Sequence, residues 1–379
     1  MKLIKGLLFL GILAVLAISL SPYYVKSLSK YPKIEQTVVT LHENFLKVPT
    51  GIGEMRSVAW NPDGRTVFAG AWRFTLSLKK IWSLYEVDVP TLKVKQVANY
   101  SGPDEIQKIS FGGAGHYVAL EFKNSAGTYI EILNYQSGSF IPLPAPNGIV
   151  FHSTSFAPSP LAFLPDGRKM LFTGFDGKKN SLCIFDLNLG VSSLVPVDSD
   201  VVEATWSPAG DKILFLAHRD KSNAIMTVSP DGTKPVSILD TGNNLSPRYS
   251  PYGQSIAFFQ VPPVIGSPTL GIMNADGSNL DFTPGLPPNP DNLSWSSDGS
   301  QLFFQAKNER GPAAIYTYIP ESHTLKKIAA GGESLSPTSE PEGHRLVFAS
   351  NREFPWLFAL YSTTPDSGEF RRLSGWFIL

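Results

Sequence analysis

The chain has 379 residues, and its 32 Lys and Arg residues balance 32 Asp and Glu residues, so the formal net charge is zero. This balance gives no reason to expect a nucleic-acid partner. Gly and Pro are abundant, at 32 and 31 residues, and with 24 Phe and 13 Tyr they favour turns and strands over helices. The single cysteine, Cys183 in "SLCIFDL", excludes an intrachain disulfide and is predicted to be a buried apolar residue.

The N-terminal segment differs in kind from the rest. Lys2 and Lys5 precede an uncharged apolar run from Gly6 to Leu20, the pattern of a secretory signal. Extended through Val25, the run reaches about 20 residues, which as a hydrophobic helix is long enough to span a bilayer. We therefore predict a signal peptide or N-terminal membrane anchor over 1–25, with residues 6–25 as the anchoring helix. The remainder is then expected outside the cytoplasm, in the periplasm or at the cell surface.

A short connecting segment is predicted at residues 26–50. It contains "IEQTVVTLH" at 34–42, which reads as a strand ahead of the first repeat. We expect this strand to pair with the last repeat and close a ring. Residues 51–379 are predicted to form the main domain.

A turn phrase recurs through that domain at intervals of 43 to 52 residues. Four residues before the turn glycine stands an aromatic residue in every copy but the last, which has Ser339. The glycines are Gly64, Gly115, Gly167, Gly210, Gly253, Gly299 and Gly343. Proline fixes φ at the start of most of these turns, and glycine takes the left-handed position without steric cost.

Each copy predicts four strands. The aromatic residue ends the first, an apolar run such as "ILFLA" forms a second strand buried on both faces, and an alternating third and a polar fourth strand follow. Four antiparallel strands repeated with a period in the forties are typical of propeller blades, which bury their faces against neighbours. We predict an all-β propeller of seven four-stranded blades, with six or eight as alternatives.

The phrases "AWNPDG", "TWSPAGDKILFLAHRD" and "SPRYSPYGQSIAFF" resemble the WD40-like repeat (PD40) of the TolB-like β-propeller family. The resemblance covers about 56–374 and implies the propeller fold. TolB itself carries an α/β domain ahead of its propeller, and only some 30 residues separate the apolar segment from the first repeat here. The resemblance therefore implies a TolB-like protein that is not TolB, and it implies no role in the Tol–Pal system.

Catalytic and metal-binding motifs are weak. No G-x-S-x-G nucleophile elbow is present, which argues against the hydrolases that share this propeller. The six histidines lack the spacing of a zinc motif, and "NADGSNLD" at 274–281 lacks the terminal Glu of a calcium loop and fits a hairpin turn. We predict no catalytic residue, no metal and no cofactor.

Binding residues are sought in irregular features. Two loops, at 145–161 and 261–270, are longer than the connection between strands requires. Long loops on a rigid scaffold often carry a binding surface. Arg73, Arg219 and Arg352 stand nine residues after their turn glycines, in the predicted loop between second and third strands. One hypothesis gives these guanidinium groups to an anionic partner, and the other gives them local roles, including ion pairs with Asp220 and Glu353.

Two functions remain open from the sequence. The first is a non-catalytic binding scaffold, monomeric and at the cell envelope, with a protein, peptide or glycan partner. The alternative is a propeller enzyme, a lyase or hydrolase acting on carbohydrate, with its site at the channel mouth. Two carboxylates, or two histidines and a carboxylate, gathered at that mouth would favour the enzyme.

Overall fold

The computed structural model describes residues 55–378, apart from short stretches at 75–79, 102–103, 113–114, 126, 150–160, 263–265, 284, 308–310, 330, 355–356 and 375–376. The described chain is all-β, and no helix occurs in it. The predicted anchor at 1–25 and the predicted closing strand at 34–42 lie outside the described residues. Within the described ranges no helix is long and apolar enough to cross a bilayer.

The described strands group into four-stranded antiparallel units, each taken in chain order. The first four units contain the following strands. Unit 1 has β1 (Met55–Trp60), β2 (Thr66–Phe74), β3 (Lys80–Asp88) and β4 (Lys93–Ser101). Unit 2 has β5 (Glu105–Gly112), β6 (Tyr117–Asn124), β7 (Gly127–Asn134) and β8 (Ser139–Ile141). Unit 3 has β9 (Ala162–Phe163), β10 (Lys169–Phe175), β11 (Asn180–Asp186) and β12 (Val191–Leu194). Unit 4 has β13 (Asp200–Trp206), β14 (Ile213–Arg219), β15 (Ser222–Val228) and β16 (Val236–Leu239).

The remaining strands continue the pattern. Unit 5 has β17 (Asn243–Tyr249), β18 (Ser255–Val261), β19 (Thr269–Asn274) and β20 (Asp281–Thr283). Unit 6 has β21 (Asp291–Trp295), β22 (Leu302–Lys307), β23 (Ala313–Ile319) and β24 (Thr324–Ala329). Unit 7 has β25 (Ser334–Ser339), β26 (Leu346–Phe354), β27 (Leu357–Thr363) and β28 (Arg371–Arg372), with β29 (Phe377–Ile378) also paired to β27. Units 4 and 5 count as one sheet because a parallel bridge joins Asn223 to Asn243.

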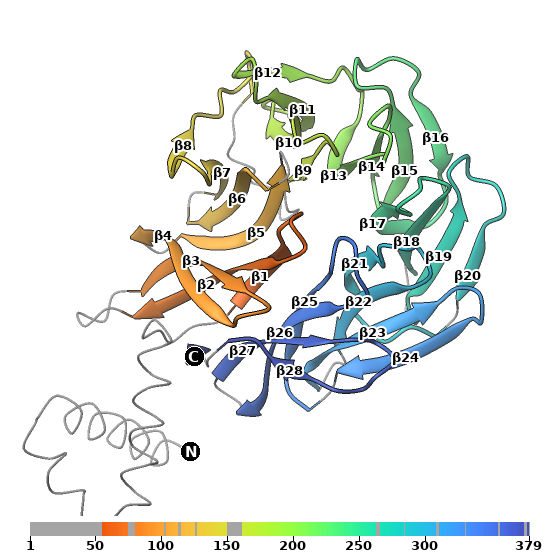
Figure 1. Cartoon of the computed structure of the whole chain (residues 1–379). Coiled ribbons are helices and arrows are strands. Elements are labelled where there is room, and N and C mark those ends of the chain that lie inside the picture. The colour runs from red at the N-terminus through yellow and green to blue at the C-terminus, as the bar shows by residue number, and fades with distance from the viewer. Residues whose placement is uncertain are drawn as a thin grey trace, which may run out of the picture. The chain divides into compact units, whose positions relative to one another are not determined.

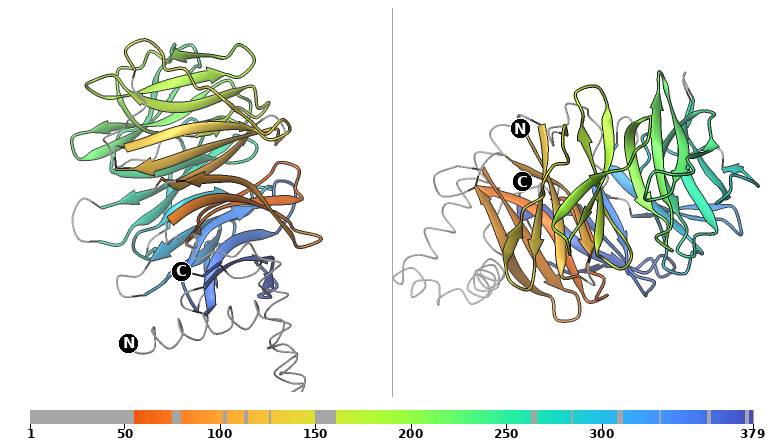
Figure 2. Two further views of the ribbon diagram at one scale, coloured as in Figure 1. Left: turned by 90° about the vertical axis from the view of Figure 1, so that its left-hand side faces the viewer. Right: turned by 90° about the horizontal axis from the view of Figure 1, so that it is seen from above.

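The units form a ring with their first strands toward the middle and their fourth strands outermost (Figure 1). Side views show the units standing beside one another around it (Figure 2). The buried clusters explain this arrangement, because each lies between two successive units. On β6, for example, Leu120 packs toward unit 1 while its neighbour Ala119 packs toward unit 3. No unit could bury both faces alone, as the repeat pattern predicted.

Unit 7 packs against unit 1, so the ring closes within the described residues. Val347 and Leu360 of unit 7 share a buried cluster with Val67 and Tyr85 of unit 1. The indole N–H of Trp60 donates a hydrogen bond to the Thr338 carbonyl of unit 7, with an N···O distance of 3.2 Å. Side-chain packing joins the two units, and their strands belong to separate sheets.

The turn residues act as expected. In unit 4, the Gly210 N–H donates to the Ser207 carbonyl at 2.9 Å, with φ of +74° at the glycine. Five other turn glycines also have positive φ, and Gly343 alone is not in that region. Cys183 is fully buried, and burial raises the pKa of its thiol to about 12, which confirms its apolar role.

The Trp206 side chain is buried and packs in the seam between units 3 and 4. Its indole N–H donates to the Ala162 carbonyl of unit 3 at 3.1 Å, and the Trp295 indole reaches the Arg248 carbonyl of unit 5 in the same way. Trp60, Trp206 and Trp295 therefore each join the first strand of their own unit to the first strand of the preceding unit in the ring.

Candidate binding site between units 5, 6 and 7

The three arginines singled out by sequence lie in strands. Arg73 is in β2, Arg219 is the last residue of β14 and Arg352 is in β26. The expectation that they occupy the loop between second and third strands is therefore wrong. The second strands run one or more residues further than predicted, because their ends still pair with the third strands, as in Arg219 with Ser222.

The predicted partners of these arginines are also wrong. Arg219 forms an ion pair with Asp240, at 2.8 Å between Nη1 and Oδ1, and both side chains are about half exposed. Asp220, the expected partner, instead adopts a left-handed backbone with φ of +41° in the tight turn after β14. An exposed pair of this kind contributes little to stability.

Arg352 lies against aromatic rings of its own unit. Its guanidinium carbon is 3.7 Å from the centroid of the Phe370 ring and 5.8 Å from that of Tyr361. Glu353, its expected partner, pairs with Arg372 at 3.2 Å. The contacts of Arg219 and Arg352 are thus local, and the structure shows no site that they build together.

A cavity of about 640 Å³ opens between units 5, 6 and 7. It lies where first strands begin and second strands end, which is the face of the ring opposite the glycine turns; we call this the pocket face and the other the turn face. Its volume falls within the range of ligand pockets, roughly 300–1,000 Å³. Three residues of the long loop noted in the sequence contribute to its wall. They are Val261, Gly266 and Pro268.

The wall is largely aliphatic. Leu245 and Leu335 face the cavity, together with three prolines, and none of the fifteen lining residues is aromatic or a histidine. The prolines are Pro268, Pro288 and Pro290. Two of them flank Asn289 in the segment that leads into β21, and Pro288 is exposed. Proline walls are rigid, because the ring fixes φ and leaves few conformations to lose on binding.

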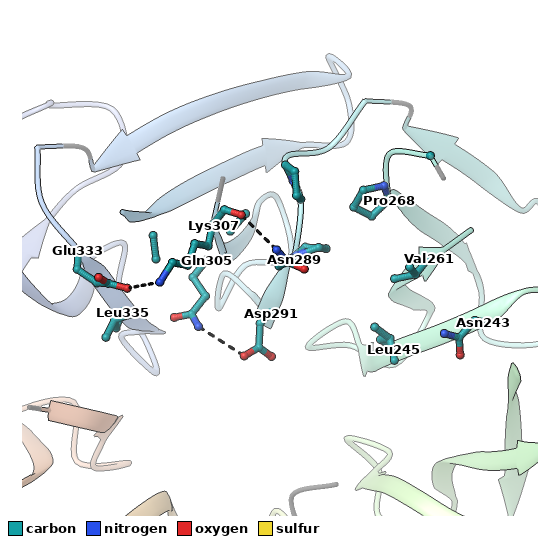
Figure 3. A pocket seen from close by; sticks show the side chains of 15 residues that line it. Asn243, Leu245, Val261, Pro268, Asn289, Asp291, Gln305, Lys307, Glu333 and Leu335 are labelled. Carbon is teal, nitrogen blue, oxygen red and sulfur yellow. Dashed lines mark hydrogen bonds and ion pairs between the residues drawn. The ribbon is translucent and has the colours of Figure 1, made fainter. Parts of the chain in front are cut away.

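Polar groups converge from units 6 and 7 (Figure 3). Lys307 forms an ion pair with Glu333 at 3.3 Å. The Gln305 amide accepts the Ser336 N–H at 2.8 Å and directs its own N–H toward Asp291 at 3.5 Å. These contacts hold Gln305 in one orientation, so that Asp291 at the start of β21 is positioned at the cavity wall.

A second group of charges lies toward the middle of the ring. Glu203 of unit 4 and Arg248 of unit 5 form an ion pair at 2.6 Å, with 16% and 28% of their side chains exposed. Burial raises the pKa of Glu203, but the charges of Arg248 and Lys108, with hydrogen bonds from Arg248 and the Ser246 N–H, lower it below its ordinary value overall. The carboxylate is thus held in its charged form.

Lys108 of unit 2 lies opposite Glu121 in the register of β5 and β6. Burial lowers the pKa of its ammonium group, and Glu203, Arg248, Glu121 and Asp291 also act on it electrostatically. Residues of units 4, 5 and 6 can influence a side chain of unit 2 only across the middle of the ring. Asp291 therefore links the cavity to this central group of charges.

Irregularities in the pairing of the first strands set the directions of these side chains. The register shifts between Ile106 and Lys108 in β5 and between Val201 and Glu203 in β13. Equivalent shifts in β17, β21 and β25 coincide with positive φ at non-glycine residues. These residues are Ser246, Asn292 and Ser336. A bulge of this kind re-aims side chains next to functional sites.

The sequence reasoning missed Lys108, Glu203, Arg248 and Asp291. The available signal concerns Arg248, whose position holds Ala, Ser or Thr in the other six copies of the repeat. Among described residues no three His, Cys, Asp or Glu side chains gather as metal ligands would. In the segment at 274–281, Asp276 accepts the Ser278 N–H within the turn between β19 and β20.

Comparison with known proteins now places the chain in a family. The TolB beta propeller domain family matches residues 145–349, more than half of the chain. The chain belongs to the TolB β-propeller family. This TolB-like propeller is also 26% identical over 178 residues to "Protein TolB homolog" of Chlorobium chlorochromatii (strain CaD3), which covers 45% of this chain and 40% of that protein. The match thus spans less than half of that relative's length.

Solved structures share the fold. An oligogalacturonate lyase in complex with manganese gives a TM-score of 0.64 at 14% identity, covering 84% of this chain and 91% of that one. The β-propeller domain of the Trilobed protease from Pyrococcus furiosus gives 0.63 at 16% identity, covering 85% and 96%. TolB from Acinetobacter baumannii gives 0.50 at 15% identity, covering 81% and 79%. Enzymes and TolB alike appear among these neighbours, so the fold alone decides no activity for the TolB-like propeller.

Proposed function

We propose that this protein is a non-catalytic propeller scaffold that binds a segment of a partner protein in the cavity between units 5, 6 and 7. Each four-stranded unit is one blade of a seven-bladed propeller over 51–379. Residues 1–25 serve as a signal peptide or membrane anchor, residues 26–50 form a stalk and closing strand, and the propeller works outside the cytoplasm as a monomer.

The cavity is the observation that carries this proposal. It combines rigid aliphatic walls with a few fixed polar groups, which is the composition of a binding pocket. Its wall includes Val261, Gly266 and Pro268 of the segment at 261–270, which departs from the repeat, and rigid scaffolds commonly present recognition surface on loops.

A carbohydrate-acting enzyme remains the second candidate because two carboxylates, Asp291 and Glu333, line the same cavity. Glu333 already forms an ion pair with Lys307, which disfavours a catalytic role for this carboxylate. The described wall also offers no aromatic ring on which a sugar could stack. A glycan partner is disfavoured for the same reason, and we therefore favour a protein segment.

A bulky residue placed in the cavity tests the proposal. Pro288 is exposed and lines the cavity, so Pro288→Trp should fill it without disturbing the core. Pro142, an exposed proline after β8 in unit 2, gives the matched control Pro142→Trp. Both variants and the wild type would be used as bait on solubilised envelopes, with captured proteins identified by mass spectrometry. We expect Pro288→Trp to lose a partner that the other two retain. Equal capture by all three would move the binding surface elsewhere.

A further inference from the structure

Two of the cations near the cavity form ion pairs. Lys307 pairs with Glu333 at 3.3 Å and Arg248 pairs with Glu203 at 2.6 Å. Lys108 faces Glu121 across two paired strands. Lys307 and Arg248 thus each have a paired carboxylate, whereas Lys108 interacts electrostatically with Glu203, Glu121 and Asp291 together.

Asp291 is the carboxylate left over. Its Oδ1 accepts the Asn292 N–H at 2.7 Å and its Oδ2 receives only the Gln305 amide, at 3.5 Å. No Lys or Arg of the described residues forms an ion pair with it, and its side chain is exposed at the cavity wall. The cavity therefore presents one exposed carboxylate that forms no ion pair with a described Lys or Arg, and Lys108 interacts with it electrostatically without forming one.

The surroundings of Asp291 suit a long cationic side chain. Leu245, Val261 and Pro288 offer apolar surface to the methylene stem of a Lys or Arg, whose charged end could then reach the carboxylate. The side-chain amide of Asn243 lines the same cavity and can hydrogen-bond a peptide backbone. An arginine could bind the Asp291 carboxylate with two parallel hydrogen bonds.

We propose that the cavity recognises a peptide segment carrying a Lys or Arg next to an apolar residue, and that Asp291 selects the cationic side chain. This inference rests on the proposed function, because it names the chemistry of the partner that the cavity takes. Gln305 acts as a positioning residue, since it holds the Asp291 carboxylate at the wall.

Arrays of immobilised heptapeptides test the inference directly. In each pool one position is fixed as a single amino acid, including norleucine as an uncharged match for lysine, and the others are randomised. We expect wild-type protein to bind Lys and Arg pools about three- to fivefold more strongly than norleucine pools, the effect of one partly exposed ion pair. The preference should shrink as salt rises from about 20 mM to about 500 mM.

Two substitutions at Asp291 separate recognition of charge from a general loss of peptide binding. Asp291→Asn should abolish the preference for cationic pools, and Asp291→Lys should turn it toward Glu and Asp pools. Asp281→Asn removes an exposed carboxylate of β20 away from the cavity wall and should leave the preference intact. Unchanged melting of each variant would show that the fold holds.

The outcomes distinguish this inference from the proposed function. Equal binding of Lys, norleucine and Glu pools by wild type, or no binding above that of Pro288→Trp, would overturn the inference. A preference that survives Asp291→Asn would do the same. The binding function would still stand if Pro288→Trp loses its envelope partner, and it would fall if that variant captures the partner normally.

Discussion

The turn face and the pocket face of the propeller are built from the same strands, yet they differ in how regular they are. On the turn face an Asp or Ser side chain closes most of the turns locally, as when Asp63 accepts the N–H groups of Arg65 and Thr66. Asp298 repeats the device with Ser300 in unit 6. On the pocket face the corresponding positions differ from unit to unit. Repeated residues therefore build the ring, and the exceptions to the repeat provide its chemistry.

Replacing a tryptophan that joins two units should have the largest effect on stability, and it tests whether repeated residues serve the fold rather than recognition. Trp206 is 6% exposed, and Trp206→Ala would remove a buried aromatic ring and a hydrogen bond to Ala162. We expect it to lower the free energy of unfolding by roughly 3–5 kcal/mol, measured by chemical denaturation. Trp206→Phe keeps most of the packing and should cost less. A Trp206→Ala protein that unfolds like wild type but no longer binds its partner would place this repeated residue in recognition instead.

On the pocket face, Asn243 and Asn244 allow a structural role and a binding role to be compared at neighbouring positions. Asn244 is fully buried, and its amide donates to the carbonyls of Asn223 and Thr241 at 2.8 and 3.1 Å, joining units 4 and 5. Asn244→Ala would leave those buried carbonyls short of a donor and should cost about 2 kcal/mol of unfolding free energy.

Asn243→Ala is the matched variant because Asn243 lines the cavity one residue away. We expect it to change the unfolding free energy by less than about 0.5 kcal/mol and to weaken binding of the peptide pools. Equal destabilisation by the two variants, compared by thermal and chemical denaturation, would contradict the separation of structural and binding roles.

The sequence was a good guide where the chain repeats itself. Leu171 and Phe172 in β10 face opposite seams, and the apolar run that contains them predicted a strand buried on both sides. The aromatic residue before the turn glycine was predicted to end the first strand, and Trp206 does end β13. A repeated position carries the same packing constraint several times, so one sequence already contains several observations of it.

The site was less accessible to sequence reasoning because it depends on backbone irregularity and on distant pairing. A shift of one residue in a strand turns a side chain to the other face, and the shifts in β5 and β13 come just before Lys108 and Glu203. Nothing local to Glu203 indicates that Arg248 lies 2.6 Å away. The three arginines were misplaced in a loop for a related reason, since a spacing of nine residues cannot show where a strand ends.

The Glu203–Arg248 pair predicts a smaller, pH-dependent effect. The lowered pKa of Glu203 means that its stabilising contribution is present above its ordinary value of 4.5 and is lost as the pH falls through the folded-state pKa below it. A double-mutant cycle of Glu203→Gln and Arg248→Gln should give a coupling energy of about 1 kcal/mol at neutral pH that declines in acid. Coupling that is independent of pH would show that the carboxylate charge does not contribute.

The three arginines give the last comparison between local and recognition roles, with small effects expected from each. Arg219 has a half-exposed ion pair and Arg352 lies over Phe370, so Arg219→Gln should cost less than about 0.5 kcal/mol and Arg352→Gln about 1 kcal/mol. With Arg73→Gln added, the triple variant should melt slightly earlier but capture its envelope partner as wild type does, after correction for folded protein. Lost capture with unchanged melting, together with a loss of salt dependence, would return these guanidinium groups to recognition of an anionic partner. If the triple arginine variant captures the partner while Asp291→Asn does not, partner recognition on the pocket face belongs to the cavity.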